Sequence, residues 1–145
     1  MGRLLAIDFG KKRIGIAVTD PLQMIATGLT TVLAHEFWPY LDKYLQAEKV
    51  ERVVVGLPVQ MNNQPSEAQQ FVRQFMSTFV KRYPAIPLDT IDERFTSQMA
   101  MQTMIDGGLK KKDRQNKALV DTISATIILQ DYMKVREHKK KLGES

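Results

Sequence analysis

Cysteine is absent from this sequence of 145 residues, and histidine occurs only twice. Without cysteine the chain forms no disulfide bond, no thiolate metal site and no cysteine nucleophile. No apolar run approaches the roughly 18 residues that a membrane-spanning helix requires. Charged Arg3 and Asp8 interrupt the first apolar stretch, so no secretory signal is expected. These absences favour a cytoplasmic protein with no membrane partner.

The composition is that of an ordinary globular domain. Hydrophobic residues make up 43% and charged residues 26% of the chain, and the length of 145 residues is close to the commonest domain size. This length excludes large two-lobed enzymes. No internal repeat or low-complexity linker divides the sequence, so we expect residues 1–145 to form a single domain.

Positive charge is concentrated at the carboxyl end. Residues 1–107 contain 11 basic and 11 acidic side chains, whereas residues 108–145 contain 10 and 5, so the whole net charge of +5 lies in the last quarter. This asymmetry indicates an anionic partner, and nucleic acid is the leading candidate. The alternative is a lysine-rich end that only keeps the protein in solution, which we favour for residues 139–141.

Apolar periodicity predicts three strands followed by alternating helices and strands. The first two strands flank a short basic turn, and the third completes an antiparallel meander. Two later strands, each preceded by a helix, add to the sheet in parallel. The predicted fold class is therefore α/β, a mixed five-stranded sheet with helices on both faces. The expected strands are 4–9, 14–18, 26–32, 52–56 and 87–91, and the expected helices are 37–47, 66–83, 96–106 and 117–135.

Three carboxylates occupy positions where the periodicity predicts an apolar setting. Asp8 ends the first strand, Glu93 closely follows the fifth strand, and Asp121 lies within the apolar last helix. Each has a local alternative: a turn role, a surface salt bridge, or a charge effect at a helix amino terminus. A common cause explains all three, because the carboxyl ends of parallel strands meet at one edge of a sheet, where ligand sites gather.

Like charges gathered at one edge require a cation. Hard divalent cations prefer oxygen ligands, and the chain offers mainly carboxylates because both His35 and His138 are expected at the surface. This donor set favours Mg²⁺ or Mn²⁺ over zinc. Two such ions activate water and stabilise the leaving oxygen in phosphodiester hydrolysis. The chemistry predicted from the residues is therefore that of a metal-dependent nuclease.

Basic side chains near the carboxylates are expected to hold the phosphate backbone of the substrate. The loop that precedes the last helix is expected to bind nucleic acid outside the reaction centre. Ordinary surface charge is the alternative for each of these side chains. The expected substrate-binding residues are Lys11, Lys12, Arg13, Arg94, Lys110, Lys111, Lys112, Arg114 and Lys117.

Four linked motifs resemble those of the YqgF/RuvX family. They read LAIDFG at 5–10 with IGIAV at 14–18, VVGLP at 54–58, DERFT at 92–96, and VD with SA at 120–125. The resemblance implies a ribonuclease H-like fold and a catalytic, metal-binding triad of Asp8, Glu93 and Asp121. It also implies processing of the 5′ end of pre-16S rRNA in ribosome biogenesis, with pre-ribosomal particles as partners.

The sequence departs from the family pattern at two places. Residues 59–65 lack the acidic, glycine-containing turn that the family commonly carries, and Ala118 and Ser124 occupy the two positions where related junction resolvases place a fourth carboxylate. Two alternatives stay open: a Holliday junction resolvase acting on DNA, and a non-catalytic RNA-binding assembly factor. RNA is the favoured substrate, and the sequence leaves the oligomeric state open.

Overall fold

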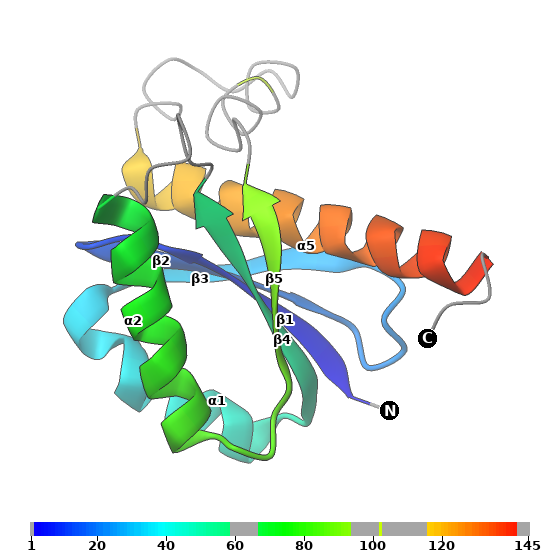
Figure 1. Ribbon diagram of the computed structural model, residues 1–145, viewed down its shortest axis with the longest axis horizontal. Helices are drawn as coiled ribbons and strands as arrows, with labels where there is room; N and C mark the ends of the chain where they lie inside the picture. The colour runs from blue at the N-terminus through cyan, green and yellow to red at the C-terminus, as the bar shows by residue number, and fades with distance from the viewer. Residues whose placement is uncertain (1, 59–66, 94–101, 103–115, 142–145) are drawn as a thin grey trace.

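Five strands form one mixed sheet in the computed structural model, which describes residues 2–58, 67–93, 102 and 116–141 (Figure 1). The strand order is β3-β2-β1-β4-β5. The pairs β1–β2 and β2–β3 are antiparallel, whereas β1–β4 and β4–β5 are parallel. This arrangement confirms the predicted meander with two added parallel strands. The strands are β1 (Arg3–Phe9), β2 (Arg13–Thr19), β3 (Ala26–Leu33), β4 (Val50–Pro58) and β5 (Leu88–Glu93).

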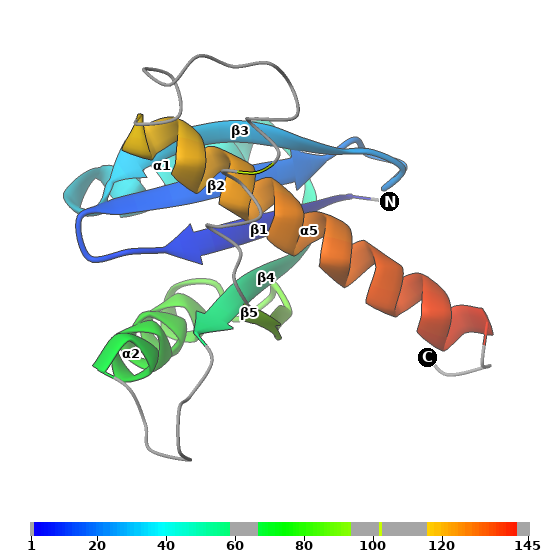
Figure 2. The same ribbon diagram turned by 90° about the horizontal axis from the view of Figure 1, so that it is seen from above.

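Helices cover both faces of this sheet. Helices α1 (Phe37–Ala47) and α2 (Glu67–Arg82) lie on one face, and α5 (Lys117–Lys141) crosses the other (Figure 2). A single 3₁₀ turn, η1 (Ala34–Glu36), leads into α1. Helix α5 is longer than expected, because no helix-breaking residue follows position 135 until Gly143 and the intervening arginine and lysines are good helix formers.

Strand residues alternate between two cores. In β1, Leu5 and Ile7 pack towards α1 and α2, whereas Leu4 and Ala6 pack towards α5. Apolar spacings of three and four residues put the buried side chains of each helix on one face. Among those side chains are Phe37 and Leu41 of α1, Val72, Phe75 and Phe79 of α2, and Ala125, Ile128, Leu129 and Tyr132 of α5.

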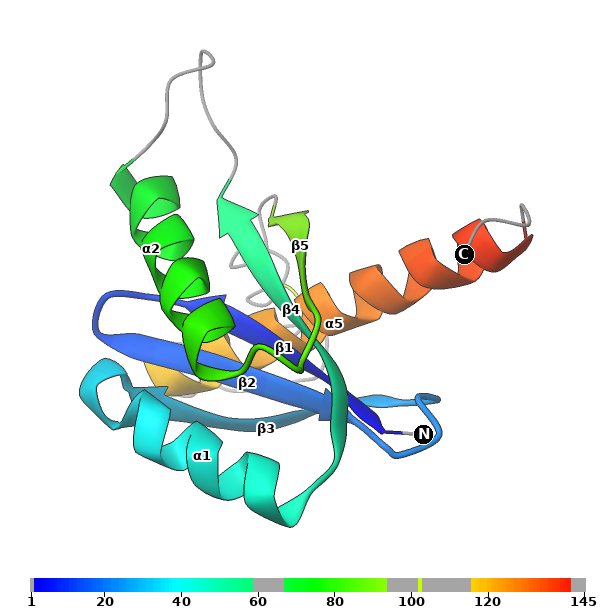
Figure 3. The same cartoon turned by 60° about the horizontal axis from the view of Figure 1, so that its bottom comes forward.

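Helix α5 is attached to strands on both sides of the sheet centre. Near its start, the Thr31 hydroxyl of β3 donates a hydrogen bond to the backbone oxygen of Ala118 at 2.7 Å. Towards its other end, the Tyr132 hydroxyl donates to the carboxylate of Asp89 in β5. The helix therefore crosses the sheet diagonally, as Figure 3 shows from below. These two attachments fix the first turns of α5 above β2 and β3.

Several expectations lie outside the described residues, among them the first residue of the helix expected over 66–83 and most of the helix expected over 96–106. Within the described ranges, no helix is both long and apolar enough to cross a membrane. Both histidines are exposed, as expected.

The aromatic ring of Phe9 packs against Phe71 and Phe75 of α2, with ring centroids 5.2 and 4.4 Å away.

Candidate active site

Asp8 and Asp121 both lie next to Gly15 of β2. Asp8 pairs directly with Gly15 in antiparallel register, and its alternate neighbours Leu4 and Ala6 pack on α5, so Asp8 belongs to the α5 face of the sheet. A Cβ added to Gly15 would lie 2.6 Å from the carbonyl carbon of Asp121 and 3.2 Å from its Cβ. Asp121 therefore lies directly over Gly15, beside the strand position of Asp8.

Glu93 is the last residue of β5, at the same end of the sheet as Asp8. The parallel register pairs Ile7 with Val55 and Pro58 with Glu93. Two strand spacings, about 10 Å, separate β1 from β5. The Glu93 side chain lies outside the described part of the structure, and no group of three potential ligands could hold a metal among the residues that are described. The triad as a whole stays a prediction.

Asp121 forms an ion pair with Arg13, the first residue of β2. Arg13 Nε donates a hydrogen bond to Asp121 Oδ2 at 3.0 Å, and the two side chains are 31% and 25% exposed. Burial raises the pKa of the Asp121 carboxyl, whereas the hydrogen bond and charge of Arg13 and the charge of Lys117 lower it. The pKa remains raised, so these cations only partly offset the loss of hydration.

The other described basic residues lie farther from this ion pair. Lys11 Nζ is 2.6 Å from a carboxylate oxygen of Glu67 and 5.7 Å from the ring centre of Phe71, so Lys11 extends towards α2. Lys12 is exposed in the β1–β2 turn, and Lys117 is exposed at the start of α5. Five predicted substrate-binding residues lie outside the described ranges: Arg94, Lys110, Lys111, Lys112 and Arg114.

The profile of the family described as "RuvX: Holliday junction resolvase" matches residues 2–135. The chain belongs to the RuvX family. A curated relative from Phocaeicola vulgatus is 58% identical over 95% of this chain and 99% of the relative. One from Bacteroides thetaiotaomicron is 56% identical over 92% of this chain and 96% of the relative. Both carry the name "Putative pre-16S rRNA nuclease".

Solved structures similar to this RuvX chain include junction resolvases. Thermus thermophilus RuvC bound to a Holliday junction aligns with a TM-score of 0.56 at 18% identity, covering 94% of this chain and 96% of RuvC. The fowlpox virus Holliday junction resolvase aligns with a TM-score of 0.54 at 14% identity. The alignment covers 92% of this chain and 99% of the viral resolvase. These likenesses confirm the ribonuclease H-like fold. The predicted nuclease activity agrees with the family description and with the names of the curated relatives.

Sequence reasoning missed two residues that position Asp121 in this RuvX protein. Gly15 admits the α5 backbone at close range, and an isolated glycine inside an apolar strand is a recognised signal of such an approach. Asn116 caps α5, because its Oδ1 accepts a hydrogen bond from the Leu119 amide at 3.2 Å. Asparagine directly before an apolar helix is a typical amino-terminal cap.

Ser124 lies one turn after Asp121 and is fully buried. Its hydroxyl has no hydrogen-bond partner among the described residues. An α-helix has about 3.6 residues per turn, so residues two positions apart point to nearly opposite sides. Thr122 contacts Thr31 of β3, and Ser124 therefore points away from β3. Because buried polar groups are nearly always hydrogen-bonded, an unpartnered hydroxyl one helical turn from Asp121 is unusual.

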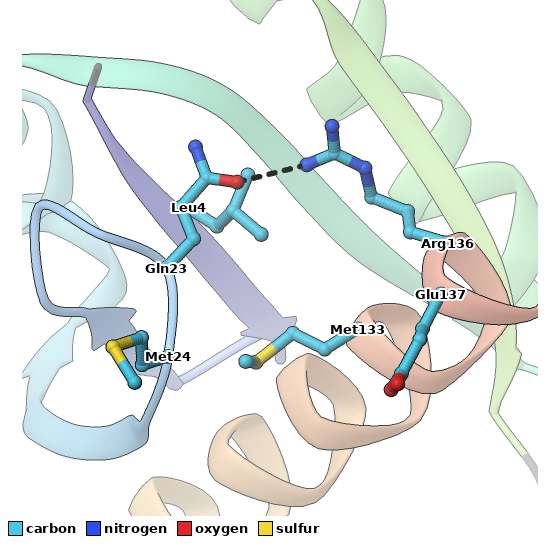
Figure 4. Close-up of a pocket in the computed structure, with 6 residues that line it drawn as sticks. All are labelled: Leu4, Gln23, Met24, Met133, Arg136 and Glu137. Atoms are coloured by element: carbon cyan, nitrogen blue, oxygen red, sulfur yellow. Dashed lines mark hydrogen bonds between the residues drawn. The ribbon is translucent and has the colours of Figure 1, made fainter. Parts of the chain in front are cut away.

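A separate pocket of about 250 Å³ lies at the start of β1, on the side of the sheet covered by α5. Leu4 lines it, four residues before Asp8, so about 13 Å of strand separates the pocket from the acidic edge. Arg136 closes one side by donating a hydrogen bond to Gln23 Oε1 at 3.3 Å (Figure 4). Met24 and Met133 give it an apolar wall, and neither offers a group for acid–base or metal chemistry.

Proposed function

We propose that residues 1–145 form one metal-dependent nuclease domain that cleaves phosphodiester bonds of structured nucleic acid in the cytoplasm. The proposed substrate is the 5′ end of pre-16S rRNA. The observation that supports this proposal is that Asp8 pairs with Gly15 and Asp121 lies over Gly15, at the end of the sheet where Glu93 ends β5. The RuvX family description and the names of the curated relatives support the reaction class.

The donor set at this edge fits a hard divalent cation. Asp8 and Asp121 offer oxygen atoms, the chain has no thiol, and the His35 side chain is 77% exposed, far from a buried ligand position. Asp121 is a partly buried carboxylate with a raised pKa, so it gains from a cation placed against it. Asp8, Asp121 and Glu93 would hold Mg²⁺ or Mn²⁺. When bound, such an ion supplies an activated water and stabilises charge on the phosphoryl group.

The chain's own residues supply position and charge. The sheet register fixes Asp8, while the Asn116 cap and the contacts of Thr31 fix the first turns of α5 and thereby Asp121. Arg13 and Lys117 bring two positive charges to the same edge, where they bind and orient the phosphates on either side of the scissile bond. The excess of basic residues after position 107 extends this contact along the nucleic acid.

A cleavage assay tests the proposal. The purified full chain is incubated with an RNA containing the 5′ end of pre-16S rRNA in Mg²⁺, Mn²⁺ or EDTA. Asp8→Asn and Asp121→Asn should each reduce cleavage to the level seen in EDTA. Asp42→Asn is the matched control, because Asp42 pairs with Arg82 on the opposite face, so this variant should cleave like the wild type.

A four-way DNA junction is the second substrate in the same assay. The family description favours it as the alternative substrate. Cleavage of the junction without cleavage of the RNA would transfer the proposal to DNA. Binding of RNA that needs no metal, leads to no cleavage and is unchanged by both substitutions would overturn the nuclease proposal in favour of an RNA-binding assembly factor.

A further inference from the structure

Arg13 is paired with the same carboxylate that the proposed function assigns to a metal ion. We propose that Arg13 and a divalent cation exchange on Asp121: the guanidinium neutralises the carboxylate until the cation binds, and then moves to a phosphate of the substrate. This inference rests on the proposed function and deepens it, because it makes metal binding and substrate binding interdependent through one side chain.

The ion pair belongs to the packed structure and is not a chance surface contact. Arg13 stands two residues before Gly15, which contacts α5, and therefore belongs to the same face of β2. Its backbone pairs with Leu33 of β3, so only its side chain is free to move. Nε lies 3.0 Å from Asp121 Oδ2, with both side chains less than one third exposed. The guanidinium therefore occupies space directly against the carboxylate.

A metal ion and the guanidinium compete for this space and repel each other. Two cations about 4 Å apart interact unfavourably, and more strongly so in a partly buried site than in bulk water. A divalent ion that takes Asp121 Oδ2 as a ligand must therefore displace Arg13 from that oxygen. Guanidinium groups bind phosphate oxygens through two parallel hydrogen bonds, so a phosphodiester arriving at this edge gives the displaced Arg13 a new partner.

The exchange predicts opposite effects on the two ligands. Removing the Arg13 charge should tighten metal binding in the absence of nucleic acid, because the competitor is gone. The same change should weaken nucleic-acid binding in the presence of metal, because the phosphate loses a partner. A purely structural role for Arg13 would weaken both, and a role confined to phosphate binding would leave metal affinity unchanged.

Titration of Mn²⁺ alone into the full-length protein, followed by isothermal calorimetry, measures the first effect. We expect Arg13→Gln to bind Mn²⁺ about three- to tenfold more tightly than the wild type, the range given by the loss of a partly exposed ion pair. Fluorescence anisotropy with a labelled RNA hairpin, in Ca²⁺ to slow turnover, measures the second effect. There Arg13→Gln should bind more weakly than the wild type.

Two controls separate exchange from simpler effects. Lys117→Gln also removes one positive charge near Asp121. Lys117 lowers the pKa of Asp121 through its charge alone, without a hydrogen bond. Lys117→Gln should therefore raise Mn²⁺ affinity less than Arg13→Gln does. Arg52→Gln removes an ion pair with Asp89 of similar length, 2.9 Å, and should leave Mn²⁺ affinity unchanged. Arg13→Lys keeps the charge and should stay close to the wild type, which keeps the test valid if Arg13→Gln folds poorly.

The outcomes distinguish this inference from the proposed function. If Asp121→Asn loses Mn²⁺ binding while Arg13→Gln binds no more tightly than the wild type, the exchange is wrong and the metal site stands. Equal gains in Lys117→Gln and Arg13→Gln would also overturn the exchange, because they would indicate a general charge effect. If neither the wild type nor Arg13→Gln binds Mn²⁺, both the exchange and the metal-dependent nuclease are overturned.

Discussion

Gly15 and Asp121 are in backbone contact where β2 meets α5. A side-chain carbon on Gly15 would lie 2.6 Å from the carbonyl carbon of Asp121, inside the 3.0 Å below which real Cβ contacts essentially do not occur. Because the obstructing atoms belong to the helix backbone, they cannot move aside as a side chain can. The distance between β2 and α5, and hence the approach of Asp121 to Asp8, depends on glycine at this position.

Gly15→Ala should therefore push α5 away from the sheet. We expect a loss of about 1–3 kcal/mol in the free energy of unfolding, typical of overpacking a close contact, together with weaker Mn²⁺ binding. Urea denaturation and calorimetry measure the two effects. Gly28→Ala is the comparison variant, because its added Cβ would meet a side-chain carbon of Thr122 at 2.6 Å rather than helix backbone. A Gly15→Ala variant as stable as the wild type would contradict this account.

The sheet and its covering helices were predictable because their signals are local. Two continuous apolar runs around a basic turn located β1 and β2, and the spacing of apolar residues predicted a helix over 37–47, which matches α1 (Phe37–Ala47). The end of α5 was predicted six residues too early, at position 135 rather than 141. There the apolar pattern stops while charged helix-forming residues continue the helix.

The candidate site was predictable in part. That Asp8, Glu93 and Asp121 form one site stays a prediction, whereas the strand pairing of Asp8 with Gly15 and the position of Asp121 over Gly15 are features of the fold. The partner of Asp121 was not foreseen, because Arg13 lies 108 residues away in the chain. Nor was it foreseen that Lys11, only two residues from Arg13, extends to Glu67 on α2. Both outcomes depend on which face of the sheet each side chain takes.

Ser124→Ala should leave the protein as stable as the wild type or more stable. The Ser124 hydroxyl is buried without a partner among the described residues, and removing such a group relieves a desolvation cost. Thr122→Val provides the contrast, since the Thr122 hydroxyl lies 2.6 Å from the Thr31 hydroxyl and 3.0 Å from the backbone oxygen of Ala118, and its one hydrogen bonds to one of these two oxygens. Its loss should cost about 0.5–1.5 kcal/mol. Thermal denaturation compares the two variants.

A destabilised Ser124→Ala variant would show that the hydroxyl has a partner in the folded protein. The cleavage assay adds an independent measurement. If the hydroxyl holds a water molecule or ligand atom beside Asp121, cleavage should fall while stability is maintained.

Asp20 should hold the β2–β3 loop in shape. Its carboxylate accepts hydrogen bonds from the amides of Leu22, Met24 and Ile25, at 3.2, 2.8 and 2.8 Å. The bond from Ile25 is the main cause of a lowered pKa at Asp20. Because the pKa of Asp20 is lower in the folded state, its hydrogen bonds contribute to stability above the unfolded pKa of 3.8. This stabilisation is lost as the pH falls through the folded-state pKa.

Asp20→Ala should speed hydrogen exchange at those three amides at neutral pH. Asp20→Asn keeps a side-chain carbonyl acceptor but loses the charge, so its exchange rates should lie between those of Asp20→Ala and the wild type. Unchanged protection in Asp20→Ala would show that the backbone alone maintains the loop.

The raised pKa of Asp121 predicts how stability and metal binding depend on pH. Burial is the main cause, and a folded-state pKa above the unfolded value of 3.8 means that protonation favours the folded state. The resulting contribution is fully present below the unfolded pKa and is lost as the pH rises through the folded pKa. At neutral pH without metal, the ionised Asp121 therefore opposes folding.

Asp121→Asn, which mimics the protonated carboxyl, should be more stable than the wild type at pH 7 in EDTA, and this difference should shrink towards pH 3. Mg²⁺ should reverse the order at pH 7, because a ligand that binds only the folded wild type stabilises it by mass action. Urea denaturation at both pH values, with and without Mg²⁺, measures all four differences. An Asn variant less stable than the wild type in EDTA at pH 7 would mean that the Arg13 ion pair outweighs the desolvation of Asp121, opposite in sign to the pKa shift.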